Sequence, residues 1–365
     1  MFKVNWWRTS FGEEEVKKLA ESVANQRISH GKVTEEFEKQ FAEAMDVPYA
    51  LAATSGSTAL VLALMAFGIG RDDEVIIPDR TWIATAHAVL MVGARVVLVD
   101  VRPDIPLIDV EKIREKITSK TKAIIPVHLN GRSAEMNALN ELAKEYDLFV
   151  IEDAAQAMFS KGPGGYLGTQ SDIGCFSLSI AKLISTGQGG MIVTKNKELC
   201  EKLKLVRNHG VVDNFTEAWN QFGMNFKFTD LLSSFGLVQL QKVKERINHV
   251  TAIYQLYRDG LDKLPFLKLV PVDIDKGEVP VWIDALCENK WDLINFLKEK
   301  GIQARPYSPN LHTSDYINNP GDFPNSNKFY DLGMYLPCGP AQPLENIQFV
   351  IDTLGQYQVK ELCGK

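Results

Sequence analysis

Apolar residues recur in short runs through the first half of the chain, and stretches with helical spacing separate them. Four runs have the length and composition of buried strands: residues 74–78, 95–100, 123–127 and 148–153. Between them, apolar positions three and four residues apart predict helices: residues 81–92, 110–117 and 134–146. This alternation is typical of βαβ units, so we predict an α/β fold with a buried, mostly parallel sheet.

Helical patterns also precede this alternation. A helix is predicted over residues 13–25, and a second one over residues 35–45. Thr34 is a suitable N-cap for the second helix, and Phe37 and Phe41 lie one turn apart on its predicted buried face.

The C-terminal third has a different pattern. A long helical stretch covers residues 229–264 and is interpreted as the bridge to a second domain. Mixed elements follow: strands near residues 267–272 and 279–287, a helix over 289–300 and a closing helix from Leu344. We therefore predict a large domain over residues 1–240 and a smaller α+β domain over residues 241–365.

Composition narrows the classes of function. The 365 residues are 45% hydrophobic, which supports a sizeable core, and carry a net charge of −6. Neither a basic run nor a zinc-type Cys/His spacing is present, so no nucleic-acid partner and no metal site is expected. No apolar stretch reaches membrane-spanning length, and five scattered cysteines fit reduced thiols, so a cytoplasmic location without membrane contact is expected: Cys175, Cys200, Cys287, Cys338 and Cys363.

Lys182 is the residue that most needs an explanation. It lies among apolar and small residues between two strand-like segments, within residues 171–194. Burying an ammonium group is costly, and a desolvated lysine has a lowered pKa that makes its amine nucleophilic. The position therefore favours a chemical role for Lys182.

Two further motifs suit the same chemistry. Residues 54–58 (TSGST) precede a predicted helix over residues 59–67, whose first N–H groups can bind a phosphate. Asp153 ends a strand and can hold a protonated pyridine nitrogen, while Lys182 can form an imine with an aldehyde. Taken singly, the first motif is an ordinary N-cap and the aspartate an ordinary helix cap. Together the three predict pyridoxal 5′-phosphate as cofactor.

The order of motifs resembles one family over nearly the whole chain, the DegT/DnrJ/EryC1/StrS sugar aminotransferases of the type I pyridoxal-phosphate fold. The segments that carry the resemblance are ISHGKVTEEFEKQF, TSGSTAL, IIPDRTWIATAHAVL, PVHLNGRSAEMNAL, VIEDAAQA, FSLSIAK, RNHG and GMNFKFTDLLSSFGLVQL. The resemblance implies a large domain that holds the cofactor, a smaller C-terminal domain and a homodimer.

The resemblance also implies roles for single residues. Lys182 would be the catalytic lysine, Asp153 would hold the proton on the cofactor's ring nitrogen, and Trp82 would stack on the ring. Gln156 would lie beside the ring hydroxyl. The remaining implied cofactor contacts concern the phosphate, with Asn225 reaching the cofactor of the partner subunit: Gly56, Ser57, Ser177 and Asn225.

A keto sugar as acceptor and L-glutamate as donor are likewise implied. The tract over residues 182–190 is similar to the perosamine-synthase branch, which indicates a nucleotide-linked 4-keto-6-deoxyhexose, although Gln188 stands where that branch has an acid. The glutamine at position 156 is common among 3-amino-sugar enzymes. A 3-keto sugar, a cyclitol and a small phosphorylated ketone therefore stay open as acceptors.

Two alternatives concern the type of activity. A dehydratase of the same fold would carry histidine where this chain has Lys182, which argues against it. A regulatory protein that binds ligand without turnover is disfavoured by the intact Lys182, Asp153 and Ser177.

Several aromatic and glycine positions keep a structural interpretation. Trp6 and Trp7, in the extended segment 1–12, either line the site or pack, and packing or subunit contact is favoured. The glycine-rich segment 162–168 lacks the dinucleotide-binding order and is interpreted as a loop.

The histidines are assigned no chemistry. His87 is interpreted as a satisfied core residue, because it lies on an otherwise apolar helix. His128 receives no role, and His312 is interpreted as a loop histidine without a task.

Overall fold

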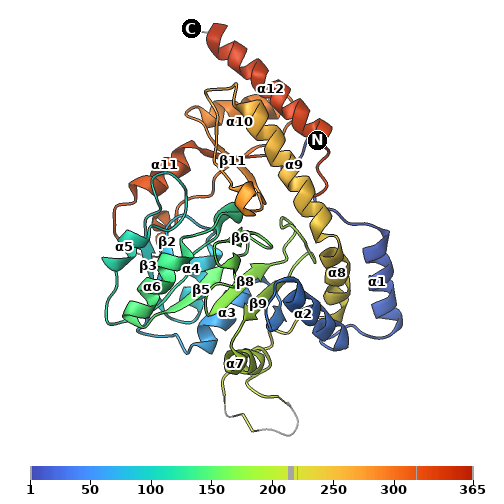
Figure 1. Ribbon diagram of the computed structural model, residues 1–365, viewed down its shortest axis with the longest axis vertical. Helices are drawn as coiled ribbons and strands as arrows, with labels where there is room; N and C mark the ends of the chain where they lie inside the picture. The colour runs from blue at the N-terminus through green and yellow to red at the C-terminus, as the bar shows by residue number, and fades with distance from the viewer. Residues whose placement is uncertain (1, 213–217, 220, 318, 364–365) are drawn as a thin grey trace.

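A seven-stranded sheet forms the centre of the larger part of the molecule (Figure 1). The structure is a computed structural model that describes residues 2–212, 218–219, 221–317 and 319–363. The strands follow the order β1-β9-β8-β5-β4-β2-β3. Their bounds are β1 (Tyr49–Ala53), β2 (Glu74–Pro78), β3 (Arg95–Val99), β4 (Thr121–Ile124), β5 (Phe149–Asp153), β8 (Ile173–Ser177) and β9 (Gly190–Thr194). Only β9 runs antiparallel to its neighbours, so the predicted mostly parallel sheet is confirmed.

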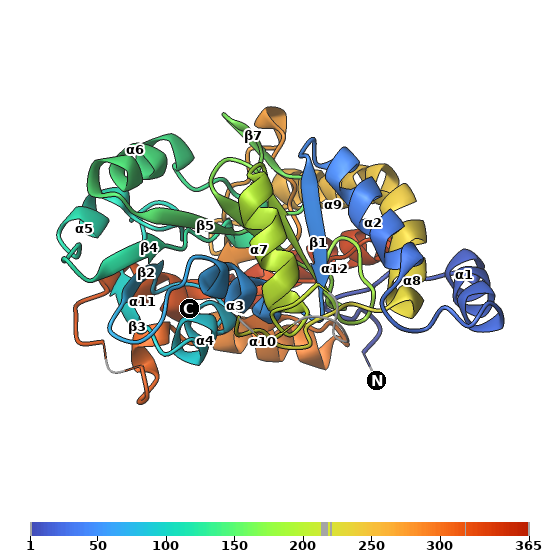
Figure 2. The ribbon, with the colours of Figure 1, turned by 90° about the horizontal axis from the view of Figure 1, so that it is seen from below.

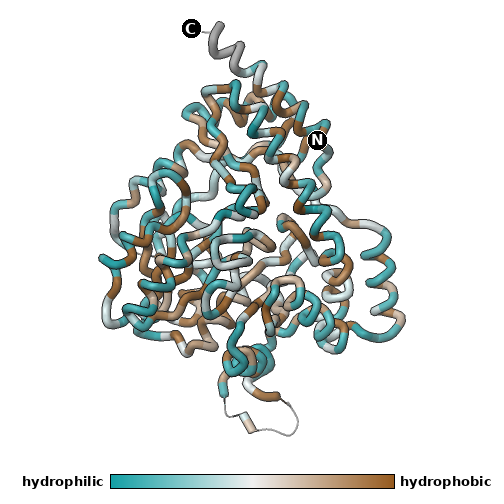
Figure 3. The backbone as a smooth tube through the Cα atoms, in the orientation of Figure 1, coloured by the Kyte–Doolittle hydropathy of each residue, from teal (hydrophilic) through white to brown (hydrophobic). Residues whose placement is uncertain are grey.

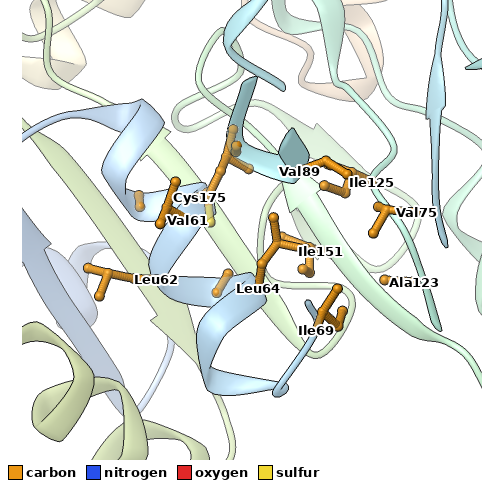
Figure 4. Close-up of a cluster of buried hydrophobic side chains, with 14 of the residues drawn as sticks. Val61, Leu62, Leu64, Ile69, Val75, Val89, Ala123, Ile125, Ile151 and Cys175 are labelled. Carbon is orange, nitrogen blue, oxygen red and sulfur yellow. The ribbon is translucent and has the colours of Figure 1, made fainter. Parts of the chain in front are cut away.

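Helices cover both faces of this sheet, which explains why its strands are apolar throughout. Successive side chains point to opposite faces: Val75 and Ile77 pack with α3, α4 and α7, whereas Ile76 packs with α5 and α6. Figure 4 shows Val61 and Leu64 of α3 in one apolar cluster with the strand residues Ile151 and Cys175. The helices are α3 (Gly56–Ala66), α4 (Ala84–Met91), α5 (Val110–Arg114), α6 (Met136–Tyr146) and α7 (Lys197–Arg207).

The helices α1 (Glu13–Ala24) and α2 (Lys32–Ala44) pack beside α8 (Asp230–Gln241), as Figures 1 and 2 show. Phe37 and Phe41 are fully buried, as predicted. Thr34 does not cap α2. The helix begins earlier, after Gly31, and the hydroxyl of Thr34 donates to Asp230 over 2.7 Å. Thr34 therefore joins two helices instead of starting one.

The predicted long helix is two helices, α8 and α9 (Val243–Leu261), which meet at Lys242. The side chain of Lys242 pairs with Glu15 of α1. Buried positions continue at helical spacing through the junction, with Gln239 and Arg246 seven residues apart. The sequence pattern therefore shows one helix where the backbone forms two.

A four-stranded antiparallel sheet lies in the C-terminal part, in the order β10-β11-β13-β12. Its strands are β10 (Lys268–Leu269), β11 (Ile283–Leu286), β12 (Arg305–Pro306) and β13 (Gly333–Leu336). The helices around it are α10 (Lys290–Glu299), α11 (Pro324–Leu332) and α12 (Leu344–Cys363). The N-terminal segment joins this part, because Val4 pairs with Ile302 and packs in the same apolar cluster.

Short elements complete the chain. The segment predicted as a plain loop at residues 162–168 contains a small hairpin, because β6 (Lys161–Gly162) pairs with β7 (Gly165–Tyr166). The described residues also form the 3₁₀ turns η1 (Leu129–Gly131), η2 (Ile274–Lys276) and η3 (Leu311–Thr313). The two large sheets lie on either side of residue 240, and the domain boundary itself stays a prediction.

Hydropathy follows this arrangement. In Figure 3 the outlying helix α1 is largely hydrophilic, whereas hydrophobic segments concentrate in the interior. Among the described residues, no helix combines the length and the apolar character that crossing a membrane requires.

Candidate active site

A pocket of about 380 Å³ lies where β5 and β8 end, beyond the carboxyl ends of the parallel strands. It brings together seven of the eight residues that the sequence indicated: Gly56, Ser57, Trp82, Asp153, Gln156, Ser177 and Lys182. They come from the start of α3, the segments after β2 and β5, the end of β8 and the turn between β8 and β9. Residues more than a hundred positions apart thus share one cavity.

The amine of Lys182 is buried in this pocket. Burial disfavours the ammonium form and lowers the pKa of Lys182 to about 8, although the nearby charge of Asp153 acts in the opposite direction. The Nζ atom lies 4.9 Å from the centre of the Trp282 ring, and the indole N–H of Trp282 donates to the Ala181 carbonyl over 3.0 Å. The pocket therefore holds an amine that deprotonates far more readily than a surface lysine.

Asp153 ends β5 with its carboxylate in the pocket wall. Burial raises its pKa, and hydrogen bonds that favour the charged form oppose this shift. The hydroxyl of Thr85 donates to Oδ2 over 2.8 Å, and the Ala155 N–H donates to Oδ1 over 3.2 Å. Thr85 was missed by the sequence analysis, and the available signal was a hydroxyl on the otherwise apolar helix α4.

The first turn of α3 contains both the groups that cap the helix and backbone N–H groups that can bind a ligand. Ser55 is the N-cap: its Oγ accepts from the Thr58 N–H over 3.1 Å, and the Ser55 N–H donates to the Thr58 hydroxyl over 2.8 Å. Within the described chain, the N–H groups of Gly56 and Ser57 have no hydrogen-bond partner. The motif is thus both an N-cap and a helix start that can accept an anion.

Gly56 packs directly against Ser177. A Cβ atom at position 56 would lie 2.9 Å from the Ser177 Cβ, so a larger residue would push the helix start away from β8. The Ser177 Oγ accepts a long bond of 3.3 Å from the Ser179 N–H. Two N–H groups and one hydroxyl therefore converge on one end of the pocket.

Gln156 and Trp82 lie on other walls. The Gln156 Oε1 accepts from the Asn130 N–H over 3.1 Å, and Asn130 has a left-handed backbone with φ of 55°. Trp82 is 58% exposed, which excludes the interpretation as a core tryptophan. Its indole can therefore be covered by a ligand.

Asn225 does not line the pocket of its own chain. It is exposed, its Oδ1 accepts from the Lys227 N–H over 3.4 Å, and its backbone pairs with Asn208. A contact of Asn225 with a partner subunit stays a prediction.

The N-terminal tryptophans differ from each other. Trp6 is buried and also lines the pocket, with its ring centre 5.6 Å from that of Trp282. Trp7 donates from its indole N–H to Thr9 and to the Ile180 carbonyl. The pocket is also lined by residues that the sequence did not indicate as site residues, among them Thr81, Ser179 and Arg305. Gln188 lines it as well.

The histidines lie outside the pocket. His87 is exposed and its Nε2 lies 2.7 Å from the Tyr316 hydroxyl, so the interpretation as a core residue is wrong. The helix α4 faces solvent at this position although its neighbours are apolar. His128 is buried against Glu152, and His312 contacts Asp79 over 2.7 Å.

The donor set of the pocket fits pyridoxal 5′-phosphate. Lys182 offers an amine for the aldehyde, Asp153 offers a carboxylate for the ring nitrogen, and the free N–H groups beside Ser177 offer a phosphate site. In the described part of the chain, no group of three or more His, Cys, Asp or Glu residues is placed to hold a metal ion. Cys175, Cys200, Cys287 and Cys338 are buried and form no disulfide.

Comparisons with known proteins agree on one kind of chemistry. The sequence profile of the DegT/DnrJ/EryC1/StrS aminotransferase family matches residues 9–355. The chain is 34% identical over 336 residues to GDP-perosamine synthase of Escherichia coli O157:H7, which covers 90% of this chain and 91% of that protein. It is 37% identical over 290 residues to GDP-perosamine synthase of Caulobacter vibrioides, covering 78% of each chain. The crystal structure of DesV from S. venezuelae superposes with a TM-score of 0.90 at 31% identity and covers 94% of each chain.

Proposed function

Because the chain belongs to the DegT/DnrJ/EryC1/StrS aminotransferase family, we propose that it aminates a nucleotide-linked 4-keto-6-deoxyhexose with L-glutamate as donor. The family membership makes it a pyridoxal-phosphate-dependent aminotransferase that acts on a keto sugar. The observation that carries the proposal is the buried Lys182, whose pKa is lowered to about 8 in the same pocket as the Asp153 carboxylate.

The residues divide the work by their chemistry. When bound, pyridoxal phosphate supplies an electron-withdrawing ring that makes the donor's α-proton acidic. Lys182 would hold the cofactor through its Nζ and, once released, move a proton between the donor carbon and the cofactor carbon. Asp153 would keep a proton on the ring nitrogen, and the hydrogen bond from Thr85 favours the charged form of the Asp153 carboxyl against the effect of burial, which raises its pKa.

Binding and orientation fall to the remaining residues. The N–H groups of Gly56 and Ser57 and the Ser177 hydroxyl would bind the phosphate. Trp82 would cover one face of the ring, and Gln156 would lie near the ring hydroxyl. Trp6 and Trp282 line the side of the pocket next to Lys182 and would exclude water from the lysine.

The acceptor is inferred from the relatives. Two of them are named for making GDP-perosamine, which supports a nucleotide-linked 4-keto sugar as acceptor here. Gln156 and Gln188 line the pocket. Glutamine at position 156 resembles 3-amino-sugar enzymes, and Gln188 departs from the perosamine-synthase pattern, so a 3-keto sugar is the second candidate. Analysis of the product by NMR distinguishes the two, because the new amine is placed on C4 or on C3.

A cytoplasmic homodimer is the proposed working form. The exposed Asn225 would complete the phosphate site of the partner subunit. Mixing inactive Lys182→Ala with inactive Asn225→Ala protein, after exchange of subunits, should restore up to about a quarter of wild-type activity, because only mixed dimers contain one intact site. Failure of the mixture to regain activity, with mixed dimers present, would contradict the shared site.

The first experiment is an absorbance spectrum of the purified protein before and after addition of L-glutamate, beside Lys182→Ala. Wild type should lose the band of the lysine-bound cofactor and gain that of the aminated cofactor. Lys182→Ala should lack the lysine-bound band and should lose at least about 10³-fold in turnover. A band that neither glutamate nor loss of Lys182 alters would contradict the assignment.

A further inference from the structure

Arg305 is a charged residue at the pocket to which the proposed chemistry gives no task. Three charged side chains line the pocket within the described chain, and Lys182 and Asp153 are the other two. Arg305 belongs to the edge strand β12 and pairs with Tyr335 of β13. Its side chain is exposed, and no carboxylate or other hydrogen-bond acceptor of the described residues binds its guanidinium. The cation is therefore available to a ligand.

Aromatic rings hold Arg305 at a defined place. The guanidinium carbon lies 4.3 Å from the centre of a Trp6 ring, and the Trp6 ring lies 5.6 Å from that of Trp282. Stacking of a guanidinium on an indole leaves its N–H groups free at the edge of the plane. Arg305 can therefore present two parallel donors to an oxyanion while it stays on Trp6.

The same rings connect Arg305 with the reactive lysine. Lys182 lies beside Trp282, whereas Arg305 lies on Trp6, so the two cations adjoin different members of the indole pair. The Trp282 indole N–H donates to the Ala181 carbonyl, and the Trp6 backbone N–H donates to the Gln303 side chain over 3.0 Å. The Trp6 indole N–H has no hydrogen-bond partner among the described residues, and packing against Trp282 and Tyr335 holds its ring. The spacing between the two cations is thus built into the fold.

We propose that Arg305 binds the diphosphate of the nucleotide-linked sugar, with the sugar ring lying along Trp6 and Trp282 and its keto carbon toward Lys182. This inference rests on the proposed function and adds the group that recognises the acceptor. The two carboxyl carbons of L-glutamate lie one and three bonds from the reacting carbon, whereas the nearer phosphorus of a nucleotide-linked 4-keto sugar lies five bonds from the keto carbon. A cation beyond the indole pair matches the longer substrate.

Direct binding measures this contact without turnover. The dissociation constants of GDP and UDP, and of guanosine and uridine as phosphate-free comparisons, are measured by calorimetry on the cofactor-loaded protein. We expect wild type to prefer a nucleoside diphosphate over its nucleoside. Arg305→Gln should weaken diphosphate binding by roughly 10- to 100-fold and leave nucleoside binding unchanged, because a charge-assisted hydrogen bond is lost. Arg305→Lys should retain part of the affinity as a point charge.

A matched control removes the same charge elsewhere. Lys300 is an exposed cation that lies 5.5 Å from the Phe296 ring centre and does not line the pocket. Lys300→Gln changes the net charge as Arg305→Gln does and should leave diphosphate binding at the wild-type value. A loss of affinity of equal size in Lys300→Gln would show a general effect of net charge and overturn the proposal.

The two half-reactions distinguish failure of this inference from failure of the proposed function. Arg305→Gln should convert the cofactor with L-glutamate at the wild-type rate, as read from absorbance, since the donor does not use Arg305. A slowed donor half-reaction with unchanged diphosphate affinity would overturn the inference and make Arg305 a carboxylate site. Absence of any nucleotide binding to wild type would overturn both the diphosphate site and the nucleotide-linked acceptor, and a normal glutamate response would still establish the aminotransferase.

Discussion

The fold surrounds two cations, Lys182 and Arg132, in opposite ways: Arg132 has a carboxylate partner, Asp284, that raises its pKa, whereas the pKa of Lys182 near Asp153 is lowered. Arg132, after η1, is fully buried and donates to both oxygens of Asp284 on β11, once over 3.0 Å. It also donates to the Pro271 carbonyl over 2.7 Å. Burial by itself would lower the pKa of Arg132, but the Asp284 carboxylate outweighs it and raises the pKa.

Lys182 is buried without such compensation, so its pKa falls to about 8 and its amine becomes reactive. A fully hydrogen-bonded ion pair serves structure, because it joins the turn after β4 to the C-terminal sheet. An incompletely paired cation such as Lys182 is available for the chemistry proposed above, because its burial favours the neutral form. The two cations differ in the number of their partners, and the Arg132 side chain is also more deeply buried than that of Lys182.

The two regions are connected. Asn130 donates from its side chain to Asp284 over 2.7 Å, and its N–H donates to Gln156 in the pocket over 3.1 Å. Tyr307 also donates to Asp284. The junction between the sheets therefore helps to orient one wall of the site.

The largest effect on stability is expected from breaking the buried Arg132–Asp284 pair, which is called the junction pair below. Asp284→Ala leaves Arg132 buried and unpaired and should lower the free energy of unfolding by about 3–5 kcal/mol. Urea denaturation of the two proteins measures this change. Arg132→Met combined with Asp284→Leu should recover much of the loss, because no buried charge then remains.

A surface pair supplies the matched control for this experiment. Glu201 pairs with Lys204 over 2.8 Å on the exposed face of α7. Glu201→Ala should cost less than about 1 kcal/mol. An equal loss in the free energy of unfolding for Asp284→Ala and Glu201→Ala would show that the junction pair does not stabilise the fold as expected.

The next effect concerns the cost of the buried amine. In the cofactor-free protein at pH 7, Lys182→Met should be more stable than wild type by roughly 3 kcal/mol, because the folded state raises the energy of the ammonium form. Below about pH 8 Lys182 is protonated in both the folded and the unfolded protein, so its burial destabilises the folded state by the full amount. Between about pH 8 and 10.5 only the unfolded state stays protonated, so the cost disappears as pH rises.

Urea denaturation at pH 7 and at about pH 10.5 measures the difference between Lys182→Met and wild type. Lys300→Met removes an exposed lysine and should show no such dependence on pH. A gain in Lys182→Met that is the same at both pH values would mean that packing, and not charge, sets it.

The smallest effect sharpens the role of the hydroxyl at the site. Thr85→Val removes the 2.8 Å hydrogen bond to Asp153 and should raise the carboxyl pKa further, because the charged form loses a donor. We expect roughly tenfold lower activity near pH 7 and a shift of the acidic limb of the pH–rate profile to higher pH. Thr353→Val, which removes a buried threonine hydroxyl bonded to the Phe349 carbonyl, serves as control and should leave the profile unchanged.

Sequence patterns identified the elements better than their junctions. The strands around residues 74–153 were predicted because apolar runs are local signals. The break at Lys242, the role of Thr34 and the exposure of His87 were missed, because each depends on contacts with distant segments.

The sequence by itself determined the α/β class and the helix start at residues 54–58, and it singled out Lys182 and Asp153, which the fold brings into one pocket. The identities of these residues and their order carry that information, since a lysine in an apolar turn and a carboxylate at a strand end have few uses together.

Tertiary structure alone decided which side chains complete the site. Arg132 and Asp284 lie 152 positions apart, and Trp6 and Arg305 meet only because the N-terminal segment pairs beside β12. No local pattern records such pairs, because their contact arises when packing of the two sheets brings distant segments together.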